Sequence, residues 1–219
     1  MGVWGVIAAP SSQAGYVKGV SVVWPPPAYM VPVLAVAVVS LLQAIRWLRH
    51  PHPRPTDKPA AVVLIAGTVW LASNALTNAS TDLATRVFWN KTQYFGIVII
   101  PPAWWVLALY YTGRTQWLTR RRFRLLSLVP CVTLLLVFTN GSHHLIWARI
   151  WTETVDSQTV LRHVPGVGLW VFVAYGFSLG LLGNFLIMRM LLQADRLYLR
   201  SGIALLVTVI LILLAAAAE

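Results

Sequence analysis

Two adjacent histidines, His143 and His144, are the residues in this sequence whose chemistry most directly suggests a functional site. Imidazole binds metals and haem and titrates near neutral pH, so paired histidines can form a metal site, a haem site or a proton relay. Neighbouring helical residues point about 100° apart, however, whereas one metal is held by residues three or four positions apart. His163 could join them only by loop closure. We therefore predict no metal site, and contact of one imidazole with a ligand, or pH sensing, stays open.

A second polar set lies in the apolar run at 59–79. Its members fall at positions i, i+1, i+4 and i+5 and so share one helical face: Ser73, Asn74, Thr77 and Asn78. Polar groups are costly against lipid, so this face should look toward other helices. Hydrogen bonding between helices explains the pattern, and a ligand pocket is the alternative.

The elements that must position these residues are membrane helices. The 219 residues are 58% hydrophobic and only 11% charged, which is too apolar for one water-soluble core. Runs of about 18 or more apolar residues, enough to cross roughly 30 Å of hydrocarbon as a helix, recur along the chain. They predict an all-α integral membrane protein, a polytopic bundle with six spans near 28–47, 59–79, 94–112, 123–140, 166–190 and 201–218. Residues 1–27 are predicted as an outer N-terminal arm, and 28–219 as the membrane domain.

The net charge of +11 follows the loops rather than a nucleic-acid-binding surface. Twelve of the 17 basic residues lie after the first, third and fifth spans: Arg46, Arg49, Arg54, Lys58, Arg114, Arg120, Arg121, Arg122, Arg124, Arg189, Arg196 and Arg200. Cytoplasmic loops of membrane proteins carry such an excess. We therefore predict a multi-pass protein of the inner (plasma) membrane with its N-terminus outside, and no nucleic-acid partner.

Several local features refine this arrangement. Pro101 and Pro102 should interrupt the third span, and Gly176 and Gly180 have the small-xxx-small spacing of close helix contacts. The segment HHLIWARIW, from His143 on, could form a short interfacial helix. Four arginines beside the membrane are predicted to bind anionic lipid headgroups: Arg120, Arg121, Arg122 and Arg124.

Chemistry that many membrane proteins require is missing from the predicted spans. No Asp, Glu or Lys lies in the middle of a span, which disfavours a proton pump, a retinal Schiff base and a transporter. No span carries a central histidine facing another, so a transmembrane haem is unsupported. We predict no cofactor. A pigment or other lipophilic cofactor is expected only if the chain is a subunit of a respiratory or photosynthetic assembly.

Three motifs resemble the N-terminal seven-helix membrane domain of bacterial and archaeal sensor histidine kinases. They are FW with QYFG (Phe88 to Gly96), PxxW with LxYTGR (Pro102 to Arg114), and TNxxHHLxW (Thr139 to Trp147), within a resemblance covering roughly residues 30–200. The resemblance implies an extracellular N-terminus, about seven helices and a signal-input role. It departs from the family in its six predicted spans, so a seventh is expected to be missing. No phosphoacceptor helix or ATP-binding domain follows residue 219, so we expect no enzyme activity from this chain, although a longer native protein could carry a kinase domain.

The leading hypothesis is a sensory or ligand-binding membrane module that relays a signal. Its expected ligand-binding residues are Asn74, Gln93, Tyr94, His143, His144, Trp147 and Tyr175, which offer hydrogen bonds and aromatic contacts. Expected partners are membrane lipids and, for a sensor, a second copy of the chain. The alternative is a non-catalytic accessory subunit of a larger membrane complex, with other membrane subunits as partners.

Overall fold

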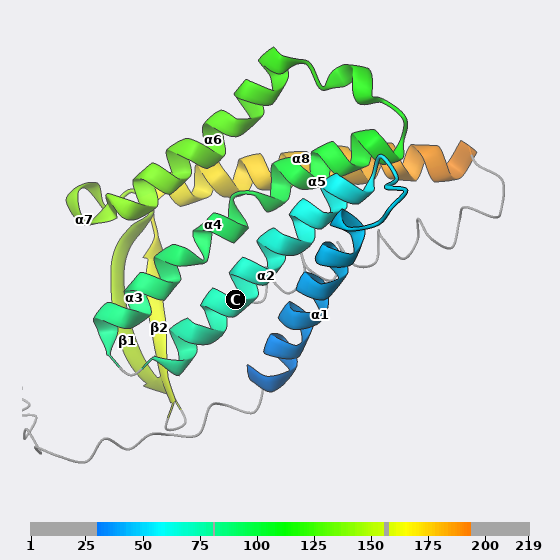
Figure 1. Cartoon of the computed structure of the whole chain (residues 1–219). Coiled ribbons are helices and arrows are strands. Elements are labelled where there is room, and N and C mark those ends of the chain that lie inside the picture. Colours follow the sequence, from blue (N-terminus) through cyan, green and yellow to red (C-terminus); the bar gives the residue numbers. More distant parts are fainter. Residues whose placement is uncertain (1–29, 81, 156–157, 194–219) are drawn as a thin grey trace, which may run out of the picture.

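The computed structural model describes residues 30–80, 82–155 and 158–193, and it is mostly helical (Figure 1). Four helical stretches are long and apolar enough to cross a membrane: Met30–Leu48, Asp57–Ala79, Leu83–Tyr111 and Val167–Leu192. They coincide with the spans predicted at 28–47, 59–79, 94–112 and 166–190. The arm at 1–27 and the span at 201–218 lie outside the described residues.

Helices α1 (Met30–Leu48) and α2 (Asp57–Ala79) lie side by side. Both bury alanines, among them Ala37 and Ala44 in α1 and Ala66 in α2, and such small side chains let helix backbones approach closely. The Thr68 hydroxyl lies 2.9 Å from Leu64 O of its own helix and 3.3 Å from Ala37 O of α1. This hydroxyl therefore links the two helices inside the apolar layer.

The third crossing is one rod of three helices, α3 (Leu83–Thr92), α4 (Tyr94–Ile97) and α5 (Ile100–Tyr111). The sequence predicted the third span near 94–112, but the helix already begins at Leu83, where the Asp82 carboxylate accepts a 2.6 Å hydrogen bond from Thr85 N. The helix is interrupted between Ile97 and Ile100, just before the prolines predicted to break it. Pro101 and Pro102 then occupy the first turn of α5, where a missing N–H is tolerated.

Helix α6 (Arg120–Phe138) follows the short 3₁₀ helix η1 (Thr115–Trp117) and covers most of the span predicted at 123–140. It is not among the four stretches that could cross a membrane by length and apolarity. Four of its first five residues are arginine, which places charge at its start. The predicted count of six spans is therefore not reached in the described part of the chain.

The predicted interfacial helix after His143 is wrong. The four-residue helix α7 (Asn140–His143) leads into an antiparallel hairpin of β1 (Trp147–Val155) and β2 (Gln158–Pro165), so the fold is not all-α. Arg149 pairs with Val164 and Trp151 with Arg162, after a register shift between Trp147 and Arg149. The segment is rich in β-branched and aromatic residues, which favour strands once a second such stretch is available for pairing.

Helix α8 (Val167–Gln193) packs along α5 and α6. A Cβ at Gly176 would lie 3.4 Å from Pro101 Cγ, and one at Gly183 would lie 2.9 Å from Trp104 Nε1, so α5 fits closely against both glycines. Gly180, predicted to form the contact pair with Gly176, has no described atom within 4 Å of its Cβ position. The close-contact pair is therefore Gly176 and Gly183, two helical turns apart.

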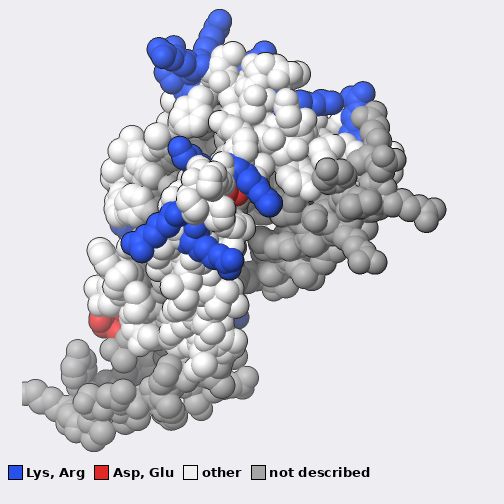
Figure 2. Space-filling model, turned by 45° about the vertical axis from the view of Figure 1, so that its right-hand side comes forward, with Lys and Arg blue, Asp and Glu red and all other residues white. Residues whose placement is uncertain are grey.

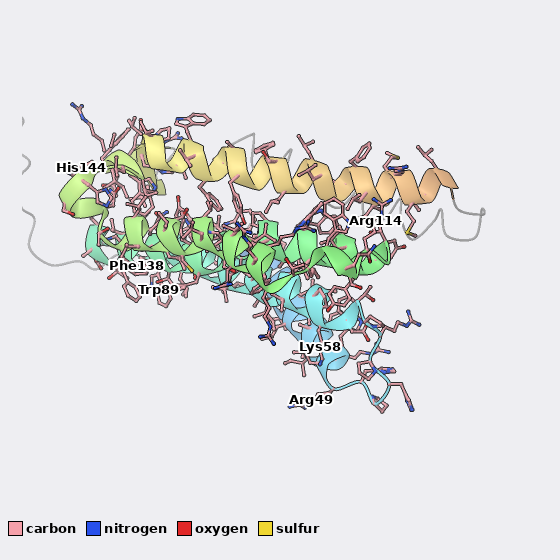
Figure 3. The ribbon with its side chains drawn as sticks, turned by 90° about the horizontal axis from the view of Figure 1, so that it is seen from above. Arg49, Lys58, Trp89, Arg114, Phe138 and His144 are labelled. Atoms are coloured by element: carbon pink, nitrogen blue, oxygen red, sulfur yellow. The ribbon has the colours of Figure 1, made fainter. Side chains whose placement is uncertain are left out.

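The bundle has two chemically different ends. Figure 3 shows His144 at one end, which we call the hairpin end, and Arg49, Lys58 and Arg114 at the other, which we call the basic end. Figure 2, with the basic end turned forward, shows many Lys and Arg side chains and few acidic ones. The connections from α1 to α2 and from α5 to α6 thus lie at the same end, as their charge predicted.

Candidate functional site

Asn140 organises the hairpin end. Its side-chain oxygen accepts hydrogen bonds from Ile146 N at 2.8 Å and Trp147 N at 3.1 Å, and its amide nitrogen donates to Trp147 O at 3.0 Å. The side chain is 7% exposed. One buried amide therefore ties the start of α7 to the start of β1. Asn140 was not predicted as a site residue, although Asn before Gly and Ser is a recognised turn signal.

The two histidines of the opening motif have separate structural roles. His143 Nδ1 accepts a 3.0 Å hydrogen bond from Leu145 N, and its Nε2 lies 3.0 Å from the Thr139 hydroxyl. His144 has left-handed backbone geometry (φ 53°) and ends α7 by donating its N–H to Asn140 O at 2.9 Å. They do not converge on one point, and no three potential metal-binding side chains gather anywhere in the described residues.

An aromatic cluster lies beneath the hairpin. Tyr94 and Trp147 meet edge to face with ring centroids 5.4 Å apart, and Phe172 is buried in the same cluster. Tyr175 packs against it and donates its hydroxyl hydrogen to Leu126 O of α6 at 2.7 Å. The structure thus brings together three predicted site residues from α4, β1 and α8 in one cluster.

A buried polar stripe runs along α3. Arg86, Asn90 and Gln93 follow one helical face and are only 5–8% exposed. The oxygens of Asn90 and Gln93 have no hydrogen-bond donor among the described residues. An unpaired buried acceptor costs about 1–3 kcal/mol. Because these side chains are buried between helices, the stripe belongs to a polar interior and not to a lipid-facing surface.

The polar face predicted on α2 is also present. Ser73 and Thr77 are buried, and the Thr77 hydroxyl donates to Ser73 O at 2.9 Å. Asn74 is half-buried and receives hydrogen bonds from Asn78 Nδ2 on its backbone oxygen at 3.0 Å and on its side-chain oxygen at 3.3 Å. Because α2 packs against α3, the two polar faces belong to the same interior region near the hairpin end.

An open groove of about 700 Å³ lies between α3, α7 and the hairpin. Its described walls are Val87, Lys91, Asn140, Gly141, His144, Trp147, Ala148, Arg149, Ile150, Trp151 and Val164. Lys91 donates a long hydrogen bond of 3.4 Å to Phe138 O. Of the predicted ligand-binding residues, His144 and Trp147 line this groove, whereas His143 does not. Lys91 and Arg149 also line the groove, although neither was predicted from the sequence as a site residue.

A second groove of about 700 Å³ lies at the basic end, between α5 and the start of α6. Arg120 and Arg124 line it with Val106, Tyr110, Leu118 and Phe123. Arg122 instead lies over the Trp117 ring, 4.9 Å from its centroid, and donates to Trp117 O at 3.4 Å. Binding of lipid headgroups by Arg120, Arg121, Arg122 and Arg124 stays a prediction.

The sequence matches the model of one protein family. Residues 31–219 match the N-terminal 7TM region of histidine kinase, a match that covers the described helices, the hairpin and both grooves. No curated protein and no solved structure matches the chain. The matched region is the membrane part of histidine kinases and not their catalytic part. Together with its four apolar helices, this match places the protein in the membrane: it belongs to the family of N-terminal 7TM regions of histidine kinases.

Proposed function

We propose that this chain receives a signal at its hairpin end and relays it to its basic end, as the sensory input of a histidine kinase. The observation that carries the proposal is the groove lined by Trp147, because this residue also belongs to the buried cluster that contains Phe172 of α8. A ligand in the groove would therefore act on the first turns of a helix that runs the length of the bundle. No catalytic role is assigned to any residue.

We place the hairpin end outside the cell and the basic end in the cytoplasm. The support is the excess of Lys and Arg in the connections at the basic end, which is typical of cytoplasmic loops. This orientation makes the protein a multi-pass protein of the plasma membrane with its N-terminus outside. We expect a second copy of the chain as the partner. A shift of a helix in one copy can be transmitted only if that helix contacts another surface.

The proposed route follows the interface of α5 and α8. Pro101 lies against Gly176 and Trp104 against Gly183, so a shift of α8 along this interface would move two bulky side chains of α5. The rod is irregular at Gln93 and at Val98–Ile99, just before the two prolines, and these are the positions where we expect it to bend. Two-state repacking of such interfaces is a common way to transmit small displacements.

The test uses the whole 219-residue chain joined after Glu219, through one added membrane-spanning helix, to the catalytic part of a well-characterised histidine kinase, with autophosphorylation measured in membranes. The added helix brings the catalytic part to the cytoplasmic side, because six predicted spans with an outside N-terminus would leave Glu219 outside. Asn140→Ala removes three hydrogen bonds that hold the start of the hairpin to α7. We therefore expect the level of autophosphorylation to change about fivefold or more in either direction, a usual size for coupling between sites. Ser142→Ala is the matched control, because its exposed hydroxyl only donates to Thr139 O. A correctly inserted Asn140→Ala protein with unchanged phosphorylation would contradict the relay.

Nothing in the family match favours an accessory subunit of a respiratory or photosynthetic complex, and the described helices give no separate reason for a transporter. Predicted contacts of Asn74, Gln93, Tyr94, His143 and Tyr175 with a ligand stay predictions. Their positions support a polar and aromatic interior beneath the groove rather than direct contact for all of them.

A further inference from the structure

We infer that the groove at the hairpin end binds an amphiphile with one anionic head, a carboxylate or phosphate, and an apolar body. This inference rests on the proposed sensory function and names the ligand class for that site. Two observations and one length argument carry it: the sign of the charges in the groove, the largely apolar character of its remaining wall, and the depth in the membrane that the length of the rod Leu83–Tyr111 implies.

The charges in the groove are all of one sign. Lys91 and Arg149 both line it, and none of its described lining residues is acidic. The Arg149 side chain is exposed and makes no hydrogen bond or ion pair with the described residues, and Lys91 uses one of its three donors in a long 3.4 Å bond. Glu153, the acidic residue on the same strand, is already paired with Arg162 at 3.2 Å. An anionic group would satisfy both cations with charge-assisted hydrogen bonds.

Apart from Asn140 and His144, the rest of the wall is apolar and open. Val87 from α3 and Trp151 and Val164 from the hairpin line the same groove, and the two hairpin residues are 42% and 43% exposed. Exposed apolar side chains gathered in a concave surface typically mark a binding site. The volume of about 700 Å³ lies within the range of about 300–1,000 Å³ that is common for small-molecule sites. A ligand with an apolar body would cover this surface while its head lies at the cations.

The groove lies at the depth where amphiphiles orient themselves. The rod Leu83–Tyr111 has 29 residues, whereas about 20 helical residues cross the hydrocarbon layer. Twenty residues counted back from Tyr111 reach Thr92, so Lys91 falls at the boundary between hydrocarbon and headgroups. A ligand there can place its head at the level of Lys91 and Arg149 and its chain against apolar surface. Both a fatty carboxylate from solution and a phospholipid of the surrounding leaflet have this chemistry.

The binding experiment uses the whole chain in phosphatidylcholine nanodiscs, titrated calorimetrically with sodium decanoate and, separately, with 1-decanol, after subtraction of empty nanodiscs. We expect saturable binding of decanoate and none of decanol. Lys91→Met and Arg149→Met should each weaken decanoate binding about tenfold, the size of one charge-assisted hydrogen bond at a partly exposed site. Lys58→Met removes the same charge at the basic end and should leave binding unchanged.

Nanodiscs containing phosphatidylglycerol identify the source of the ligand. Loss of decanoate binding in them would assign the groove to an anionic phospholipid, and persistence would assign it to a soluble amphiphile. Equal binding of decanol, or full decanoate affinity in both groove variants, would overturn the inference. Decanoate that binds in the groove while no variant or ligand alters kinase-fusion phosphorylation would refute the relay alone. An Asn140→Ala effect without decanoate binding would refute the ligand class alone.

Discussion

At Gly96 the backbone of α4 lies directly against α2. A Cβ at this position would meet Ala66 O, and it would lie 2.7 Å from Trp70 N and 3.0 Å from Trp70 Cβ. Two of these atoms belong to a helix backbone, which cannot move aside as the end of a flexible side chain can. Gly96 therefore sets how closely the rod of α3, α4 and α5 approaches α2, and it follows directly on the site residues Gln93 and Tyr94.

Gly96→Ala should lower the stability of the bundle by about 1–3 kcal/mol, because the added methyl group forces the two helices apart. The measurement is thermal unfolding of the purified protein in detergent, followed by circular dichroism. Gly67→Ala is the matched control: it lies in α2, its Cβ would meet nothing within 4 Å, and alanine favours a helix by up to about 1 kcal/mol over glycine. A Gly96→Ala protein as stable as the Gly67→Ala protein would refute the close approach.

At the scale of the element, α3 begins with a cap that depends on charge. Asp82 precedes the helix, and its carboxylate accepts a 2.6 Å hydrogen bond from Thr85 N. The hydrogen bond from the Thr85 backbone, followed by one from its side chain, lowers the pKa of Asp82 below its ordinary value of 3.8. The cap extends α3 beyond the apolar run, and this extension carries Val87 and Lys91 into the groove.

The start of α3 should therefore loosen in acid. Because the folded-state pKa of Asp82 is depressed, its contribution is complete above the unfolded-state value and is lost as the pH falls through the lower folded value. We expect the amide resonance of Thr85 to titrate with a midpoint below 3.8. Asp82→Asn keeps an oxygen acceptor without a charge and should abolish this titration. A Thr85 midpoint at or above 3.8 would contradict the cap.

At the scale of the whole molecule, the proposed relay depends on the separation of the two ends. Figure 3 places Arg49, Lys58 and Arg114 far along the bundle from His144. The same separation appears in the grooves, since Lys91 and Arg149 line one and Arg120 and Arg124 the other. A signal received at one groove must therefore be carried by whole helices to reach the other end.

Cysteine labelling of intact cells tests the orientation of these ends. Cys131 is the single cysteine, so Cys131→Ser provides a background in which one new thiol is read at a time. Ser142→Cys at the hairpin end should react with a membrane-impermeant maleimide in intact cells. Lys58→Cys at the basic end should react only after the cells are permeabilised. The reverse pattern would invert the topology, and reaction of both thiols in intact cells would show an even number of membrane crossings between them, which would contradict a crossing by α6.

The membrane architecture was readable from the sequence because its causes are local. A helix needs about 20 apolar residues to cross hydrocarbon. Composition alone therefore predicted the stretches found at Met30–Leu48, Asp57–Ala79 and Val167–Leu192. The sorting of Lys and Arg along the chain likewise predicted which connections share an end. The polar face of α2 followed from helical periodicity alone.

The groove was decided only by the tertiary structure, because its parts depend on partners far apart in the sequence. The strands at 147–165 form because they pair with each other. The amphipathic pattern of one segment does not show whether a second segment is available for pairing, so it could not distinguish a strand from a helix. Arg86 is buried because α3 continues past the apolar run and packs against α2. Lys91 of α3 and Arg149 of β1 meet in one groove because Asn140 holds the start of the hairpin to α7. Local composition determined which segments are apolar enough to enter the membrane, and long-range packing determined which polar side chains face one another there.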